Sequence, residues 1–210
     1  MTTAGIQQRY LQVTPSGAYY ATVNSQPDDA RALLLQLMSS EIPIEHSMDI
    51  FAELADLDKE HAAVLFNRLI ARRFLALVQA PKEPRQGSLE STLTDLLVTL
   101  SATGKVVLGD DQGFCLGSAG FDRDHADALA ALAADLISLH QRHQSLLNKE
   151  LQLMGESWGL LDPVGNSMLG TWIIHIGSQS FAVIIHGQPN LNQHEFVELI
   201  SALASRYLDQ

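Results

Sequence analysis

The stretch of residues 105–139 limits most strongly what this chain can fold into. Two short runs rich in β-branched and apolar residues, 105–108 and 114–116, flank a turn signal, Asp-Asp-Gln-Gly, at 110–113. From Ala126 onward, apolar residues recur at helical spacing, and many of them are alanine. Small side chains let a helix approach closely, so we expect this helix to lie flat against a sheet or against its own copy. The stretch therefore predicts a β-hairpin followed by a long helix in a small α/β unit.

Length and composition permit one large globular domain or two small ones. The chain has 210 residues, 46% of them hydrophobic and 18% charged, which is enough apolar material for a core. Its single cysteine, Cys115, excludes an intrachain disulfide framework, and its neighbours Phe114 and Leu116 predict a buried structural thiol. No signal peptide opens the sequence and no apolar run is long enough to cross a bilayer, so we expect a cytoplasmic protein without membrane contact.

The formal net charge of −11 is divided unevenly along the chain. Residues 1–86 carry 10 acidic and 8 basic side chains, whereas residues 87–210 carry 14 acidic and 5 basic ones, a net charge of −9. The second part should repel nucleic acid and anionic membranes. Any contact with DNA would be made by the first part, and DNA is not the partner we expect.

A change of composition at residues 81–88 predicts a linker between two domains. Two prolines, a glycine and mixed charges within it disfavour a helix or a central strand. We therefore expect an amino-terminal domain at residues 1–80 and a carboxy-terminal domain at residues 89–210.

The amino-terminal part predicts one strand, three helices and a closing strand. Asp58 is the expected N-cap of the third helix. This order resembles the winged-helix superfamily, and the resemblance rests on element order alone. The expected ranges are 17–23, 27–39, 47–54, 58–73 and 74–78.

The third of these helices would be the recognition helix of a winged helix. His61, Val64, Arg68 and Arg72 form one stripe along it, where Arg68 and Arg72 could meet phosphates or guanine edges. The alternative is a solvated helix face whose arginines pair with nearby carboxylates. The domain is weakly acidic and has no basic patch, which favours this alternative. The carboxylates expected within reach are Asp49, Glu53 and Asp56.

The carboxy-terminal part predicts a helix, two strands, a long helix, three strands and a final helix. Residues 106–113, residues 117–120 and the alanine-rich run from Ala128 resemble the roadblock/dynein-light-chain family. The likeness covers residues 88–208, although residues 144–170 are longer and less regular than that family shows. The expected elements are helix 89–100, strands 105–108 and 114–116, helix 126–139, one or two strands within residues 150–164 (candidates 151–154 and 159–161), strands 171–176 and 181–186, and helix 191–207 capped by Asn192.

The resemblances imply an α+β fold class, a winged-helix-like domain followed by a roadblock-like α-β-β-α-β-β-β-α sandwich. Roadblock domains pair so that two sheets and their long helices form one platform, and they serve as scaffolds or regulators of small Ras-like GTPases. For this chain the resemblance implies a homodimer that binds a protein partner, a small GTPase being the family-level expectation. The expected dimer interface is the small-residue face of the long helix: Ala126, Leu129, Ala130, Ala133, Leu136 and Ile137.

The second hairpin of this part, 171–176 with 181–186, has one wholly apolar face and one mixed face. With Ile176 opposite Phe181, the two histidines of the mixed face lie far apart, so we expect no metal site. The mixed face has the character of an interaction surface or of a second, wetter helix contact. The candidate partner residues are Ile173, His175, Ile184 and His186, with His175 expected opposite Ala182 and His186 opposite Thr171.

Catalytic motifs are missing from the sequence. It has no GxSxG, no phosphate-binding glycine-rich loop and no GxGxxG. His140, Arg142 and His143 fall at the end of the long helix, where cations complement its dipole. We expect a non-enzymatic regulatory adaptor or scaffold with no cofactor. Two alternatives are a winged-helix transcription regulator with a dimerising or ligand-sensing second domain, and a GAF-like sensor with a pocket beside residues 144–170.

Overall fold

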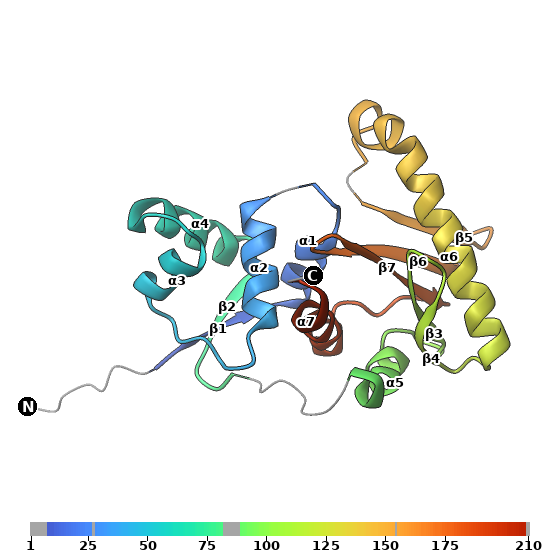
Figure 1. The fold of residues 1–210 in the computed structure, drawn as a ribbon, viewed down its shortest axis with the longest axis horizontal. Coiled ribbons are helices and arrows are strands. Elements are labelled where there is room, and N and C mark those ends of the chain that lie inside the picture. The colour runs from blue at the N-terminus through green and yellow to red at the C-terminus, as the bar shows by residue number, and fades with distance from the viewer. Residues whose placement is uncertain (1–7, 27, 82–88, 154, 209–210) are drawn as a thin grey trace, which may run out of the picture.

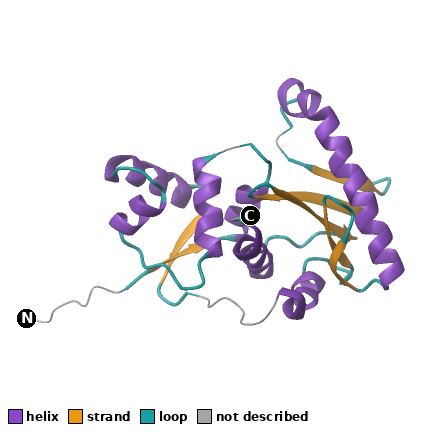
Figure 2. Cartoon of the chain, in the orientation of Figure 1, coloured by secondary structure: helices purple, strands orange, loops and turns teal. Residues whose placement is uncertain are grey.

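The computed structural model describes residues 8–26, 28–81, 89–153 and 155–208 (Figures 1 and 2). The expected linker at residues 81–88 lies outside these ranges except for its first residue. In the described part, no helix is both long and apolar enough to span a membrane. The elements are β1 (Tyr10–Val13), α1 (Pro15–Thr22), α2 (Asp29–Ser39), α3 (Met48–Leu54), α4 (Lys59–Ala71), β2 (Leu75–Val78), α5 (Leu89–Thr99), β3 (Val106–Asp110), β4 (Cys115–Ala119), α6 (Arg123–Gln144), the π-helical turn η1 (Ser145–Glu150), β5 (Ser157–Leu161), β6 (Ser167–Ile176), β7 (Gln179–His186) and α7 (His194–Tyr207).

A five-stranded antiparallel sheet in the order β4-β3-β7-β6-β5 organises the carboxy-terminal part. Helices α5 and α7 pack on one face of the sheet, and α6 crosses the other face (Figure 1). Side chains alternate along a strand, so Val106 and Leu108 of β3 join the core on the α5 and α7 side, whereas Val107 joins the α6 side. The predicted order of helix, two strands, helix, three strands and helix is confirmed.

The hairpin of β6 and β7 has a register two residues away from the expected one. Ile176 pairs with Gln179, because the chain reverses in a tight turn with Gly177 at φ 57°. His175 consequently pairs with Ser180. A slip of two residues keeps every side chain on its expected face, so the division into an apolar and a mixed face is confirmed. The pairs found in place of the other expected ones are Ile174 with Phe181, Ile173 with Ala182, Thr171 with Ile184, and Leu169 with His186.

The described residues of the amino-terminal part form four helices and a two-stranded antiparallel sheet of β1 and β2. The expected strand at residues 17–23 is wrong, because this segment forms α1. Thr14 caps the helix by accepting a hydrogen bond from Gly17 N, and Pro15 takes the first helical position, where its missing N–H is not needed. The other three helices and the closing strand are confirmed. The added helix, and the pairing of the first strand with the last, differ from the expected winged helix, which the structure does not show.

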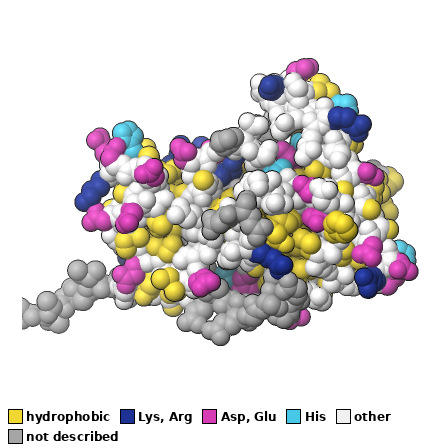
Figure 3. All heavy atoms as spheres, viewed as in Figure 1, with side chains coloured by type: hydrophobic (Ala, Val, Ile, Leu, Met, Phe, Trp, Pro, Cys, Tyr) yellow, Lys and Arg dark blue, Asp and Glu magenta, His cyan; other side chains and the backbone are white. Residues whose placement is uncertain are grey.

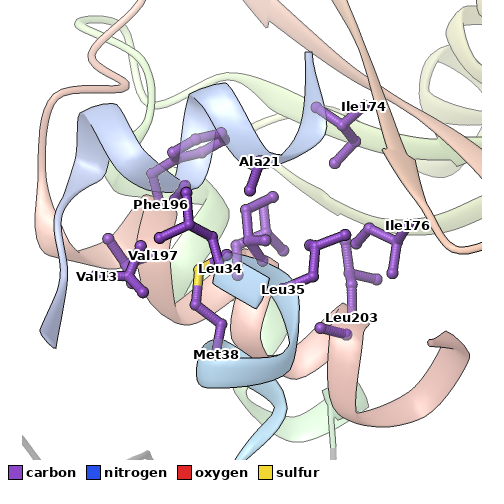
Figure 4. Packing of buried hydrophobic residues seen from close by; sticks show 14 of the residues in the cluster. Val13, Ala21, Leu34, Leu35, Met38, Ile174, Ile176, Phe196, Val197 and Leu203 are labelled. Carbon is purple, nitrogen blue, oxygen red and sulfur yellow. The ribbon is translucent and has the colours of Figure 1, made fainter. Parts of the chain in front are cut away.

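The two parts of the chain share one hydrophobic core. Helix α2 packs along α7, and α1 contacts both α7 and β6. Figure 4 shows Leu34 and Met38 of α2 beside Phe196 and Val197 of α7. Ser201 of α7 also donates a hydrogen bond to the carbonyl oxygen of Met38, which fixes the end of α2 on α7. The two expected domains are therefore in intimate contact.

Two local predictions are wrong. The three described residues of the expected strand 151–154 stay coiled, because the N–H groups of Leu151 and Leu153 donate to carbonyl oxygens of η1. The N-cap of α7 is Gln193 and not Asn192.

Gly17 of α1 packs directly on the chain that leads into β2. A Cβ atom added there would overlap the carbonyl oxygen of Phe74 and touch Val13. A backbone atom cannot swing aside as a side chain can, so we expect Gly17→Ala to lower the free energy of unfolding by about 3 kcal/mol in chemical denaturation. Gly155→Ala is the control, because the nearest atom to its added Cβ is Tyr19 Oη at 3.8 Å. Equal effects of the two substitutions would contradict the prediction.

Helices α4 and α6 begin with the same capping motif: an aspartate N-cap is followed three residues later by a histidine. Asp58 and Asp122 each accept hydrogen bonds from the backbone N–H of that histidine, His61 or His125, and lie within hydrogen-bond distance of its ring Nδ1. These backbone and side-chain hydrogen bonds lower the pKa of both aspartates below the ordinary value of 3.8.

A lowered pKa in the folded state makes the charged Asp122 stabilising above its unfolded pKa, and this stabilisation is lost as the pH falls through the folded value. We expect Asp122→Asn to lower the melting temperature at pH 7 and to have a much smaller effect at pH 2. Asp95 lies on the exposed side of α5, so Asp95→Asn should leave the melting temperature unchanged at both pH values. An effect of Asp122→Asn that persists undiminished at pH 2 would rule out this role of the charge.

Candidate interaction surface

Strand β5 forms one edge of the main sheet, and among the described residues it pairs with β6 alone. Large apolar side chains on it, on the turn that follows and at the start of β6 lie in solvent. Leu160 is 66% exposed, Leu161 62%, Val164 82% and Met168 57%. We call these four residues the β5 edge patch. An exposed, apolar sheet edge is a ready template for another strand, so proteins normally cover or interrupt it.

The patch lies beyond the main contacts of α6. This helix packs chiefly on β3, β4 and β7, and its His140 meets β5 at Trp158, two residues before Leu160. Leu160 pairs with Leu169, which contacts the core under α6, so Leu160 lies on the α6 side of the sheet. The sheet thus continues beyond the helix with an apolar side chain uncovered.

The outer side of α6 also carries an exposed apolar side chain. Leu132 there is 46% exposed. A shallow groove follows the second half of the helix. Its lining residues are Asp135, Leu136, Ser138, Leu139, Gln141 and Arg142. In Figure 3 acidic side chains are spread over the visible face of the molecule, with hydrophobic side chains between them.

Most of the expected dimer interface faces the chain's own sheet. Ala126, Ala130, Ala133 and Ile137 are at most 2% exposed and form one buried cluster with β3, β6 and β7. The close approach that their small side chains permit is made within one copy. This part of the prediction is therefore wrong. The remaining two residues of the set, Leu129 and Leu136, are half-buried.

Three of the four expected partner residues are also covered by α6. Ile173, His175 and Ile184 are at most 7% exposed, so they cannot form a surface. Both faces of the hairpin are therefore buried. The alternation of side chains in the sequence does not show whether a mixed face is buried or solvated. His186 is exposed, and its Nδ1 lies 3.1 Å from Thr103 Oγ1.

Beneath the end of α6 lies a buried polar cluster that the sequence did not indicate. Glu156 Oε2 is 2.8 Å from His175 Nε2, and His175 Nδ1 is 3.0 Å from Ser180 Oγ. His140 faces the same carboxylate and is 3% exposed, so its expected role at the helix dipole is wrong. Both histidines drew notice in the sequence, but Glu156 lies in an irregular segment where no pattern marks it. A serine, a histidine and a glutamate in sequence suggest a hydrolytic relay, yet this serine is 9% exposed, which leaves little access for a substrate.

The basic stripe of α4 is exposed as expected. Arg68 and Arg72 lie in solvent, and neither forms an ion pair with a carboxylate of the described residues. Asp49, expected to pair with an arginine, binds Lys59 at 2.6 Å. The expected pairing of Asp49 with an arginine of α4 is therefore wrong. Contact of Arg68 and Arg72 with nucleic acid stays a prediction.

Two smaller predictions can be placed. Cys115 on β4 is half-buried, and burial raises the pKa of its thiol, which suits a structural role better than a reactive one. Within the described ranges, no group of three or more His, Cys, Asp or Glu side chains has the arrangement of a metal site.

Known structures with a related arrangement resemble the chain only weakly. No family model matches it, and no curated protein matches it in sequence. A roadblock/LC7 domain from Streptomyces avermitilis is similar over 59% of this chain and 96% of that domain, with 18% identity and a TM-score of 0.37. MglB in a tetrameric arrangement is similar over 61% of this chain and 93% of its own length, with 18% identity and a TM-score of 0.33. Such scores are too low to assign a function.

Proposed function

We propose that this chain is a non-enzymatic regulatory adaptor of the roadblock type that self-associates through the β5 edge patch and the outer side of α6. One observation supports the proposal: among the described residues β5 has a free edge, and four exposed apolar side chains lie on β5 or next to it. A scaffold with this surface works by contact, and no catalytic group is needed.

Self-association would satisfy both exposed features at once. Two copies related by a two-fold axis can align their β5 strands antiparallel, which pairs the free backbone groups of each edge with those of the other. The α6 helix of each copy would then lie near the exposed sheet face of the other copy. The Leu160 side chains of both copies would be buried in the interface. The result would be one continuous sheet with two long helices on the same side, which is the platform that the resemblance implies.

The partner of this platform is proposed to be a protein. A small Ras-like GTPase is the class that the roadblock resemblance implies. The net charge of −9 on residues 87–210 favours a partner whose contact surface is basic, because opposite potentials speed encounter and reject wrong partners.

Leu160→Asp tests the self-association. It places two buried charges in a two-fold interface, so we expect the dimer to weaken about 100-fold, at 1.4 kcal/mol for each factor of ten. Light scattering at micromolar concentration should give twice the monomer mass for the wild type and the monomer mass for the variant. Ile42→Asp is the matched control, since Ile42 is 73% exposed and lies in the amino-terminal part. A monomeric wild type would overturn the proposal, as would an Ile42→Asp variant that dissociates equally.

The partner is tested separately. The wild-type chain and Leu160→Asp are each used as bait in the native cell, and the proteins retained only by the wild type are identified. Recovery of a GTPase that is lost with the variant would support the proposed class. Retention of the same proteins by both baits would show that partner binding does not need the platform.

A further inference from the structure

We propose that Glu156, His140 and His175 form a proton-sensitive latch that holds the edge strand β5 on the sheet. The three side chains are 4%, 3% and 7% exposed and come from the connection before β5, from α6 and from β6. Ser180 of β7 completes the group. Four segments of the domain therefore meet at one buried polar site.

One hydrogen bond of the latch, between Glu156 and His140, is not formed. His175 engages both ring nitrogens, one with Glu156 and the other with Ser180. His140 Nε2 lies 3.6 Å from Glu156 Oε1, and neither atom has a hydrogen-bond partner among the described residues. Buried polar atoms without partners are costly, so this side of the carboxylate is where a change of protonation has most effect.

The charge of the latch depends on how many protons it holds. With Glu156 ionised and one imidazole protonated, the site is neutral, which is the state that burial favours. With both imidazoles neutral, each can still donate one N–H to the carboxylate. A second added proton, in contrast, leaves an unpaired positive charge on His140 or His175, or removes the carboxylate charge that holds them. Imidazole is the side-chain type whose charge changes near neutral pH, so pH is the variable that tests this site.

Among the described residues, no other charged side chain forms an ion pair with the latch. Trp158 of β5 lies edge-on to His140, with ring centroids 6.1 Å apart. Toward α1, Tyr19 Oη lies 3.8 Å from the Cβ position of Gly155, and burial raises the pKa of this phenol, so it stays neutral throughout the range. Its own ion pairs join Glu156 to His140 and to His175.

The latch acts on β5 because Glu156 directly precedes it. The carbonyl oxygen of Glu156 accepts a hydrogen bond of 2.9 Å from Ile173 N, and Ser157 pairs with Trp172. When the Glu156 side chain leaves its site, β5 loses its first anchor on β6. Acidification would thereby loosen the interaction edge; the consequence for dimerisation rests on the proposed function, whereas the latch itself does not.

Amide hydrogen exchange of the full chain at pH 7.5 and 5.5, corrected for the intrinsic effect of pH on exchange, tests the latch. We expect protection of β5 and of the β6 amides paired with it to fall at least ~10-fold at pH 5.5, which corresponds to about 1.4 kcal/mol of local stability. Protection of β3, at the centre of the sheet, should not change. The measurement is repeated in Leu160→Asp, so that loss of a dimer is not mistaken for opening of the latch.

His140→Gln keeps a polar side chain but cannot take up a proton, so its difference between the two pH values should be at most ~2-fold. His143→Gln is the matched control, because His143 lies three residues further along α6 and is exposed. Equal protection of the wild type at both pH values would overturn the latch, and this comparison stands even if His140→Gln fails to fold. An undiminished difference in His140→Gln would overturn it too. A monomeric wild type in light scattering would refute the dimer alone, so the two proposals can fail separately.

Discussion

Most of this structure depends on the close packing of α6 on the sheet. Ala126, Ala130 and Ala133 are at most 1% exposed, and a Cβ atom on Gly109 of β3 would lie 3.1 Å from the Cβ of Ala130. Larger side chains at these positions would hold the helix away from β3 and β7. Because the small-residue face is used inside one copy, the outer side of α6 and the β5 edge remain exposed. The same packing places His140 over Glu156.

Periodicity in the sequence predicts the elements of this fold well and their partners poorly. The alternation in β6 and β7 assigns each side chain to the correct face, even though the register differs by two residues, because face depends only on odd or even position. Helical spacing likewise predicts α6. It cannot tell whether an alanine face meets the chain's own sheet or another copy, since both contacts require small residues.

The features that could not be predicted depend on contacts between distant residues. Glu156 lies in a segment without periodicity, and only the meeting of that segment with α6 and β6 makes its carboxylate buried. Tyr19 and Tyr20 favour a strand by propensity, yet Thr14 and Pro15 start a helix there, and its packing on α7 and β6 outweighs the weak local preference.

The seating of α2 on α7 limits how the polypeptide can be divided. Leu34 on one helix and Leu203 on the other are both fully buried, and the carbonyl of Met38 is held by Ser201. A fragment that began at residue 89 would present this strip of α7 to water and would tend to aggregate. Cleavage of the backbone between the amino-terminal and carboxy-terminal parts, by contrast, would leave the contact between α2 and α7 intact. The two fragments should therefore co-elute as a non-covalent complex.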